Sequence, residues 1–221
     1  MYFFDEETRE LITIRSSGYS WYCYRDVPGG CLISTSSNNP QGLFLFTADT
    51  HELRLLYSSG YYWNNYIEVD GGLLISSSGS NYGLLRYDYT EHTVTRLYTG
   101  GYYWNRTYAV TGGLLLTSTS SGGYGILLYD TEQKTAKQIY GSGYAWNYIH
   151  PVPSGYLLSS PNNYGIVFFD PVAKVGYQKY STGWYWNDFV DDPLGCTIYP
   201  QGMRFVRSLH WNDAERSITE N

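Results

Sequence analysis

A repeat of about 41 residues constrains the fold of this chain more than any other feature of its sequence. A short motif with a glycine three residues before a tryptophan occurs five times among the 221 residues. The tryptophans follow one another at separations of 42, 41, 42 and 40 residues, and they are Trp21, Trp63, Trp104, Trp146 and Trp186. Because chance would not maintain this spacing, we predict five structural units of one kind.

Each unit is predicted to contain four short β-strands. In the second unit we expect these strands at residues 64–69, 73–77, 84–87 and 94–98. Leucine, β-branched and aromatic residues fill the segments, whereas glycine, asparagine, aspartate and serine fill the connections. No segment has a sustained 3.6-residue period, so no long helix is expected. Four strands in about 41 residues is the length of one propeller blade.

The order of elements within a unit resembles WD40-like repeats, and the segment Gly83–Asp88, GLLRYD, is similar to the repeat of two-component-regulator propellers. The number of units and their repeated aromatic residues also resemble five-bladed lectin propellers. Repeat and resemblance together predict a single all-β domain over residues 1–221, a five-bladed β-propeller of four-stranded blades. The blades are expected to begin near residues 18, 60, 101, 143 and 183.

Residues 1–15 match the third-and-fourth-strand hairpin of a blade rather than a whole blade. Within them, Tyr2–Leu11 matches Val167–Gly176 in pattern. An open ring would expose sheet edges. We therefore expect Met1–Arg15 to close the ring by supplying outer strand to the blade that begins at Gly183–Tyr199. The third strand of that blade is expected near Met203–Val206. In the alternative, the surplus hairpin pairs with a neighbouring molecule and forms a homo-oligomer.

Blade topology predicts which loops share a surface. Links between blades and loops between second and third strands emerge at one edge, which we call the aromatic rim; the remaining turns emerge at the opposite rim. The aromatic rim is the expected functional face. Its candidate ligand-binding residues are Tyr19, Tyr61, Tyr102, Tyr144, Trp184, Tyr82, Tyr124, Tyr164, Asn64, Asn105, Asn147 and Asn187. In the packing interpretation, the repeated tryptophans fill the space between blades and the asparagines satisfy loop backbone groups.

Composition limits the ligand. Aromatic residues make up 19% of the chain, charged residues 15%, and the net charge is −6. The charge balance argues against nucleic acid as a partner, because phosphate binding needs clustered basic residues. Aromatic rings beside short amide and hydroxyl groups suit carbohydrate, whose C–H faces stack on rings. The same residue types also form adaptable protein-binding surfaces.

Catalytic and metal-binding patterns are weak. Four histidines and three cysteines show no metal-ligand spacing, so neither a metal nor a cofactor is expected. Three units carry a carboxylate five residues after the tryptophan, at Asp26, Glu68 and Asp191. Near a central axis these acids would be able to hold a cation or support glycoside hydrolysis. In the alternative they line a water-filled channel or cap backbone groups.

The sequence gives little information on location. No stretch approaches the ~18 apolar residues of a membrane-spanning helix, so no membrane span is expected. Met1–Glu7 is acidic and lacks the features of a secretory signal. The cytoplasm, export by a non-classical route and a virion are the expected locations. The leading functional hypothesis is a non-catalytic, lectin-like module, and the alternative is a structural or adhesion protein that uses the same rim for protein contacts.

Overall fold

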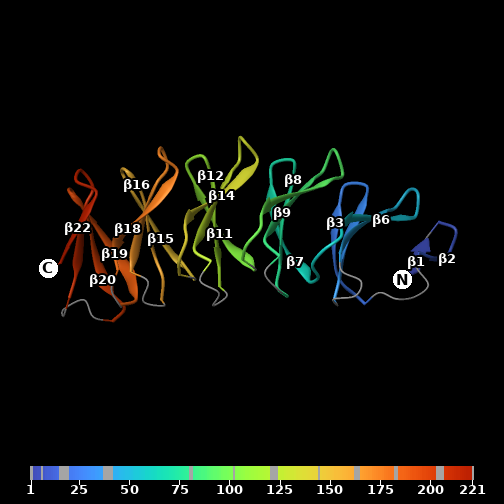
Figure 1. Cartoon of the computed structure of the whole chain (residues 1–221), viewed down its shortest axis with the longest axis horizontal. Coiled ribbons are helices and arrows are strands. Elements are labelled where there is room, and N and C mark those ends of the chain that lie inside the picture. The colour runs from blue at the N-terminus through green and yellow to red at the C-terminus, as the bar shows by residue number, and fades with distance from the viewer. Residues whose placement is uncertain are drawn as a thin grey trace. The chain divides into compact units, whose positions relative to one another are not determined.

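The computed structural model describes residues 2–5, 7–14, 20–36, 42–79, 82–101, 103–119, 124–143, 145–161, 165–181, 184–202 and 207–220, without the side chains of Phe3 and Cys23. The chain divides into two compact units: unit 1 spans Met1–Tyr103 and unit 2 spans Trp104–Asn221. Within the described ranges all regular secondary structure is β-strand (Figure 1).

Unit 1 contains a hairpin and two four-stranded sheets. The hairpin pairs β1 (Tyr2–Asp5) with β2 (Glu10–Thr13). The first sheet has the order β3 (Trp21–Val27), β4 (Gly30–Thr35), β5 (Leu43–Thr47) and β6 (Glu52–Tyr57). The second sheet has the order β7 (Trp63–Val69), β8 (Gly72–Ser77), β9 (Leu84–Asp88) and β10 (Val94–Tyr98).

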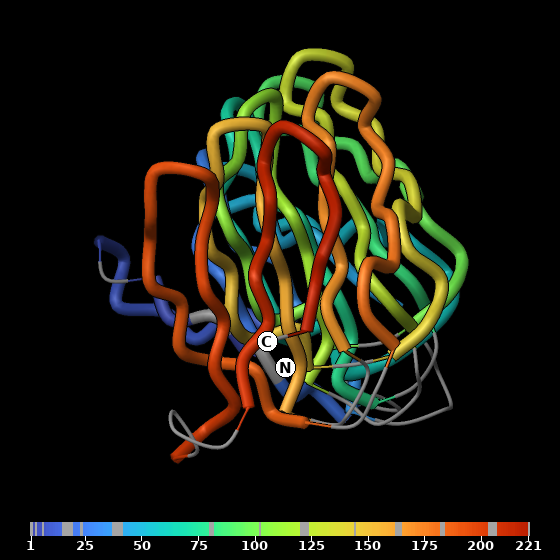
Figure 2. The backbone as a smooth tube through the Cα atoms, turned by 90° about the vertical axis from the view of Figure 1, so that its left-hand side faces the viewer, coloured from blue at the N-terminus to red at the C-terminus, as the bar shows by residue number. Residues whose placement is uncertain are grey.

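Unit 2 contains three four-stranded sheets, each an antiparallel meander of consecutive strands (Figure 2). Their strands are β11 (Trp104–Val110), β12 (Gly113–Ser118), β13 (Ile126–Asp130) and β14 (Thr135–Tyr140); β15 (Tyr148–Val152), β16 (Gly155–Ser159), β17 (Ile166–Asp170) and β18 (Val175–Tyr180); and β19 (Trp186–Asp192), β20 (Gly195–Pro200), β21 (Leu209–Asn212) and β22 (Ser217–Glu220). The prediction of an all-β chain built from repeated four-stranded sheets is confirmed, and β7 to β10 begin and end within one residue of the predicted bounds.

The last sheet corrects the expectation for Met1–Arg15. It takes all four of its strands from residues 186–220, and β22 rather than the N-terminal hairpin is its outer strand. Its third strand is β21, whereas the predicted position near Met203–Val206 lies outside the described residues. The reason is that Leu209–Asn212 repeats the apolar strand ending in a turn residue, and Asn212 Oδ1 accepts the backbone N–H of Glu215.

A buried tryptophan recurs in the repeat, and within each unit it packs between adjacent sheets. Trp63, Trp104, Trp146 and Trp186 are all 0% exposed, which agrees with the packing interpretation of these residues. In unit 1, Trp63 packs with Leu32 and Leu43 of the preceding sheet. A tyrosine that ends the preceding fourth strand meets three of the tryptophans edge-on, with ring centroids 5.5 to 5.7 Å apart; the pairs are Tyr57–Trp63, Tyr140–Trp146 and Tyr180–Trp186.

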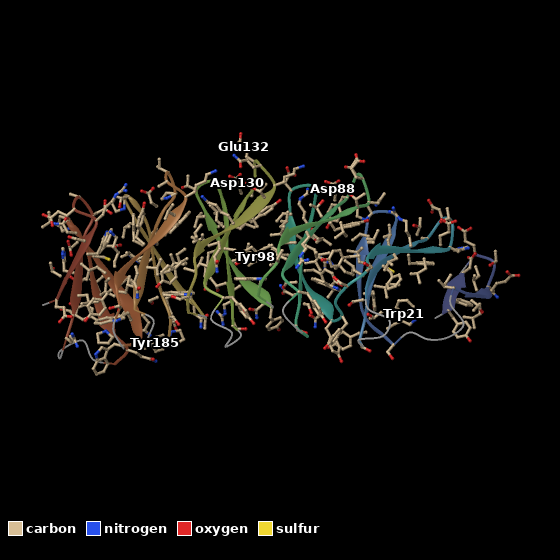
Figure 3. The ribbon with its side chains drawn as sticks, viewed as in Figure 1. Trp21, Asp88, Tyr98, Asp130, Glu132 and Tyr185 are labelled. Atoms are coloured by element: carbon tan, nitrogen blue, oxygen red, sulfur yellow. The ribbon has the colours of Figure 1, made fainter. Side chains whose placement is uncertain are left out.

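Turns between third and fourth strands are tied by an aspartate. In unit 2, Asp130 Oδ1 accepts the N–H groups of Glu132 and Gln133, while its other oxygen binds Lys174 of the next sheet. Asp170 repeats the arrangement, with Arg216 Nη1 2.6 Å from Oδ2. Asp130 and Glu132 lie at the rim opposite to Tyr185 (Figure 3). Each aspartate thus fixes a turn and joins two sheets.

The turns between first and second strands require a glycine for space. A Cβ on Gly72 would lie 2.1 Å from the carbonyl oxygen of Tyr87, and one on Gly113 would lie 2.0 Å from that of Tyr129. Backbone carbonyls cannot move away without breaking the pairing of the second and third strands. Glycine at the start of the second strand is therefore a requirement of the repeat.

Candidate binding site on the aromatic rim

In unit 1 the rim brings together rings from separate loops. Tyr61 lies in the link between β6 and β7, and Tyr82 lies in the loop between β8 and β9. Their ring centroids are 5.7 Å apart at an angle of 68°. The expectation that these two candidate residues share one surface is confirmed; ligand binding by them stays a prediction.

Further rings extend this pair into a continuous series, which we call the Tyr61 cluster. The ring centroid of Tyr62 lies 5.1 Å from that of Tyr61 and 4.6 Å from that of Tyr22. The ring centroids of Trp63 and Tyr82 are 5.9 Å apart. Trp63 is buried, Tyr61, Tyr62 and Tyr82 are half-buried, and Tyr22 is 56% exposed. The cluster therefore runs from the core outward, with its solvent-facing end at Tyr22.

Two features shape the surface of the cluster. Gly79 lies against the rings, because a Cβ there would lie 2.6 Å from Tyr62 Cδ2 and 3.0 Å from Tyr61 Cε2. Neither the Tyr61 hydroxyl nor the Tyr62 hydroxyl forms a hydrogen bond with another described residue. As far as the described residues go, both hydroxyls can bind a ligand that contacts the rings.

The asparagines that follow the tryptophans have a local role. Asn64 Nδ2 donates to Ser78 Oγ at 2.8 Å, and its Oδ1 accepts the Ser78 N–H at 3.2 Å. Asn105 makes the same two hydrogen bonds with Thr119. In both sheets the amide secures the end of the second strand, which satisfies loop backbone groups as the packing interpretation expects. Asn147 and Asn187 are half-buried at the corresponding positions.

The remaining candidates are distributed over both units. The ring centroids of Tyr124 and Trp104 are 6.3 Å apart, and this pair corresponds to Tyr82 and Trp63 in unit 1. Trp184 is 36% exposed. Tyr19, Tyr102, Tyr144 and Tyr164 lie outside the described residues.

The inner carboxylates bind basic residues of the preceding sheet. Arg25 Nη2 lies 2.5 Å from Glu68 Oε1, and His150 Nε2 lies 2.7 Å from Asp191 Oδ1. The Tyr89 hydroxyl also donates to Glu68 at 2.6 Å. This hydrogen bond and then Arg25 lower the pKa of Glu68 below its ordinary value, against the effect of burial. Glu68 and Asp191 thus each bridge two adjacent sheets.

Sequence reasoning missed these bridges, although the signal is present. Arg25 and His150 stand four residues after their tryptophans, while Glu68 and Asp191 stand five residues after theirs. A comparison of adjacent units at these two positions would have paired them. In Asp26, by contrast, the carboxylate is exposed and makes no hydrogen bond or ion pair within the described part of the chain.

An acidic cleft at the opposite rim of unit 2 was also not predicted. It has a volume of ≈ 600 Å³ and combines prolines and Leu194 with the carboxylates of Asp191, Asp192, Asp213 and Glu215. Several of these acids have partners: His210 Nε2 lies 3.0 Å from Asp192, and Asp213 accepts from Ser154 Oγ at 2.7 Å. The backbone N–H of Leu194 lowers the pKa of Asp192. Across the described ranges, no three histidine, cysteine or acidic side chains are placed to hold a metal ion.

Comparison with known proteins identifies no family. No family model matches the chain, and no curated protein matches it. Solved structures with some likeness include the extracellular domain of BT4673, a candidate one-component system of B. thetaiotaomicron (20% identity, 94% of this chain and 31% of that chain, TM-score 0.38). TolB from Acinetobacter baumannii has 15% identity over 94% of this chain and 55% of that chain, with a TM-score of 0.36.

A third such structure is an oligogalacturonate lyase in complex with manganese, with 11% identity over 92% of this chain and 65% of that chain and a TM-score of 0.31. The chain thus spans between 31% and 65% of the length of these three proteins. At these identities and TM-scores, none of them informs what this chain binds. Within the described ranges, no helix has the length and apolarity needed to cross a membrane.

Proposed function

We propose that this protein is a non-catalytic binding module that recognises carbohydrate through its aromatic rim. The observation that carries the proposal is the Tyr61 cluster, in which adjacent ring centroids lie 4.6 to 5.9 Å apart and reach from the core to solvent. A sugar offers C–H faces to such rings and hydroxyls to the Tyr61 and Tyr62 hydroxyl groups, which make no hydrogen bond with another described residue. Half-buried rings are held in place, so binding costs little side-chain entropy.

The proposal includes a five-bladed, closed arrangement of the four-stranded sheets. Its support is the repetition of strand order and of the edge-on tyrosine–tryptophan pairs between sheets. In a closed ring the rim would carry up to five related sites, and weak sites would combine on a clustered glycan. Small-angle scattering tests closure: a compact chain of this length has a radius of gyration of about 17 Å, and an open array is larger.

Two of the three inner carboxylates, Glu68 and Asp191, form contacts between sheets, which argues against a hydrolase that would use them as catalytic groups. Glu68 is occupied by Arg25 and Tyr89, and Asp191 by His150. A general acid or nucleophile needs an oxygen free to reach substrate. The alternative binding function is contact with a protein surface through the same rim. Only the identity of the ligand distinguishes it from carbohydrate binding.

Titration of intrinsic tryptophan and tyrosine fluorescence with a panel of soluble oligosaccharides tests the proposal. We expect saturable quenching by at least one sugar and a loss of about tenfold in affinity, or about 1.4 kcal/mol, in Tyr61→Ala and Tyr82→Ala. Tyr177→Ala, an exposed tyrosine on β18 in unit 2, is the matched control and should bind like the wild type. Equal affinity in all three variants would contradict the proposed site.

A further inference from the structure

Unit 2 carries a pair of phenols at the aromatic rim. Tyr148 is the first residue of β15, and Tyr185 directly precedes β19. Their ring centroids are 5.3 Å apart at an angle of 66°, and their hydroxyls form a hydrogen bond with each other. Tyr185 lies at the rim opposite to Asp130 (Figure 3). The pair therefore links two adjacent sheets at the rim.

Two residues of β11 extend this pair into a group that we call the Arg106 cluster, made of Arg106, Tyr108, Tyr148 and Tyr185. The Tyr108 hydroxyl donates to the backbone carbonyl of Asn147 at 2.8 Å. Burial raises the pKa of Tyr108, while a hydrogen bond and the charge of Arg106 lower it. Burial and then the hydrogen bond with Tyr148 raise the pKa of Tyr185 to about 12, against the charge of Arg106. The guanidinium thus lies among phenols from three successive repeats.

The Arg106 cluster has more hydrogen-bond donors than it uses internally. Arg106 is exposed and forms no ion pair with any described residue. Its guanidinium carries five N–H donors and no acceptor. Between Tyr148 and Tyr185 one hydroxyl hydrogen is shared, and the other has no acceptor within the described ranges. A positive charge and a phenol hydrogen therefore remain for an acceptor from outside the chain.

The positive charge at position 106 is a departure from the repeat. The equivalent residue of unit 1 is Asn65, which is neutral and donates to Ser76 Oγ at 3.0 Å. In the other two sheets of unit 2, Tyr148 and Asp188 stand at this position, two residues after the tryptophan. Asp188 is half-buried and has an interaction of its own. The packing shared by the sheets does not require a cation here, so Arg106 calls for another explanation.

We propose that the Arg106 cluster binds the anionic group of an acidic sugar, either a carboxylate or a sulfate ester. This inference rests on the proposed function, since it assigns one class of sugar to part of the aromatic rim. The anionic oxygens accept from the guanidinium and from the phenol hydrogen, and such charge-assisted hydrogen bonds are roughly twice as strong as neutral ones. The rings of Tyr148 and Tyr185 lie beside them for contact with C–H groups of the sugar. The Tyr61 cluster contains no cation and has no such preference.

Internal support is the alternative role for Arg106, in which the guanidinium only holds Tyr108 in place. Loss of that support would weaken binding of neutral and acidic sugars alike, or would lower stability alone. The ratio of the two affinities within one variant does not depend on how much of the protein is folded. This ratio therefore separates anion binding from internal support.

Calorimetric titration of the full chain with matched sugars tests the proposal. The panel contains gluco-, galacto- and manno-configured disaccharides, each with a hydroxymethyl group, a carboxylate or a sulfate ester at the same carbon. For at least one configuration we expect an acidic member to bind about tenfold more tightly than its neutral counterpart, as a charged hydrogen bond would provide. High salt should reduce this preference, because it screens the exposed guanidinium.

Three variants locate the preference. Arg106→Gln should abolish it, and Tyr148→Phe, which removes only a hydroxyl, should reduce it severalfold. Lys137→Gln is the matched control, because Lys137 is an exposed cation on β14 of the same unit and lies outside the cluster. It should keep the wild-type preference. Preference for the carboxylate or for the sulfate identifies the anion, and either result supports the proposal.

Binding of neutral sugars without a preference for acidic ones would overturn this inference and leave the proposed function standing. An acidic preference that persists in Arg106→Gln, or that is lost equally in Lys137→Gln, would also overturn it. An unchanged preference in Tyr148→Phe would remove the phenol pair from the site. If folded wild-type protein binds no sugar of either kind, the proposed function fails and this inference fails with it.

Discussion

His150 and Asp191 in unit 2 occupy the same two repeat positions as the Arg25–Glu68 ion pair in unit 1. His150 Nε2 lies 2.7 Å from Asp191 Oδ1, and Arg25 Nη2 lies 2.5 Å from Glu68 Oε1. The base belongs to the first strand of one sheet and the acid to the first strand of the next. A pair of positions in the repeat thus encodes a bridge between sheets.

We predict that Asp191→Asn lowers the free energy of unfolding by less than about 1 kcal/mol. The Asp191 side chain is 75% exposed, and exposed ion pairs contribute little because water and salt screen them. Urea denaturation at low and high salt measures this effect. A loss of unfolding free energy several times larger would contradict the interpretation of this contact as an exposed bridge.

Trp146→Ala is predicted to lower the free energy of unfolding by about 3–5 kcal/mol, because it empties a buried site between two sheets. Trp146→Phe should lose less stability, because an aromatic ring remains to contact Tyr140 edge-on. Trp184→Ala is the control, because Trp184 is partly exposed and is expected to lose much less. Equal losses in Trp146→Ala and Trp184→Ala, measured by urea denaturation, would contradict the assigned packing.

The aspartate-tied turns predict how stability responds to acid. The Arg86 guanidinium, together with the N–H of Glu91, lowers the pKa of Asp88 to about 2. A lowered pKa in the folded state means that the stabilisation is complete above the ordinary carboxyl pKa near 4 and is lost as pH falls toward 2. Asp88→Asn should therefore lose stability at pH 7 and show a weaker dependence between pH 4 and pH 2.

Urea midpoints from pH 7 to pH 2 measure this dependence, with Glu91→Gln in the same turn as the control. Glu91 is exposed, so the control should keep the wild-type profile. An Asp88→Asn profile that parallels the wild type throughout would show that the Asp88 carboxylate contributes nothing to acid sensitivity.

Gly113→Ala is predicted to destabilise unit 2 by more than about 2 kcal/mol, since the added Cβ would lie 2.0 Å from the Tyr129 carbonyl oxygen. Gly141→Ala provides the control, because the nearest atoms to a Cβ there belong to the flexible Gln138 side chain at 3.9 Å. Thermal unfolding of both variants is the measurement. Similar melting temperatures of the two variants would refute the steric requirement for glycine at position 113.

The fold was largely predictable because the repeat shows the same strand pattern several times. Misplacing the third strand of the last sheet had a physical cause: this strand carries His210 where Leu45, Leu128 and Phe168 stand in other sheets, which weakens the apolar pattern.

The site was predictable in part for a similar reason. The meeting of Tyr61 and Tyr82 follows from strand order, which places their loops at one rim. The bridges Arg25–Glu68 and His150–Asp191 and the acidic cleft depend on how adjacent sheets are offset, which strand patterns within one unit do not contain.

A glycan array tests the central claim most directly. It should be probed with labelled wild-type protein and with a Tyr61→Ala/Tyr82→Ala variant whose folded state has been established by circular dichroism. The account predicts a restricted set of glycans bound by the wild type and lost in the variant. An array left blank by folded wild-type protein, or signals equal for both proteins, would contradict carbohydrate recognition by the aromatic rim.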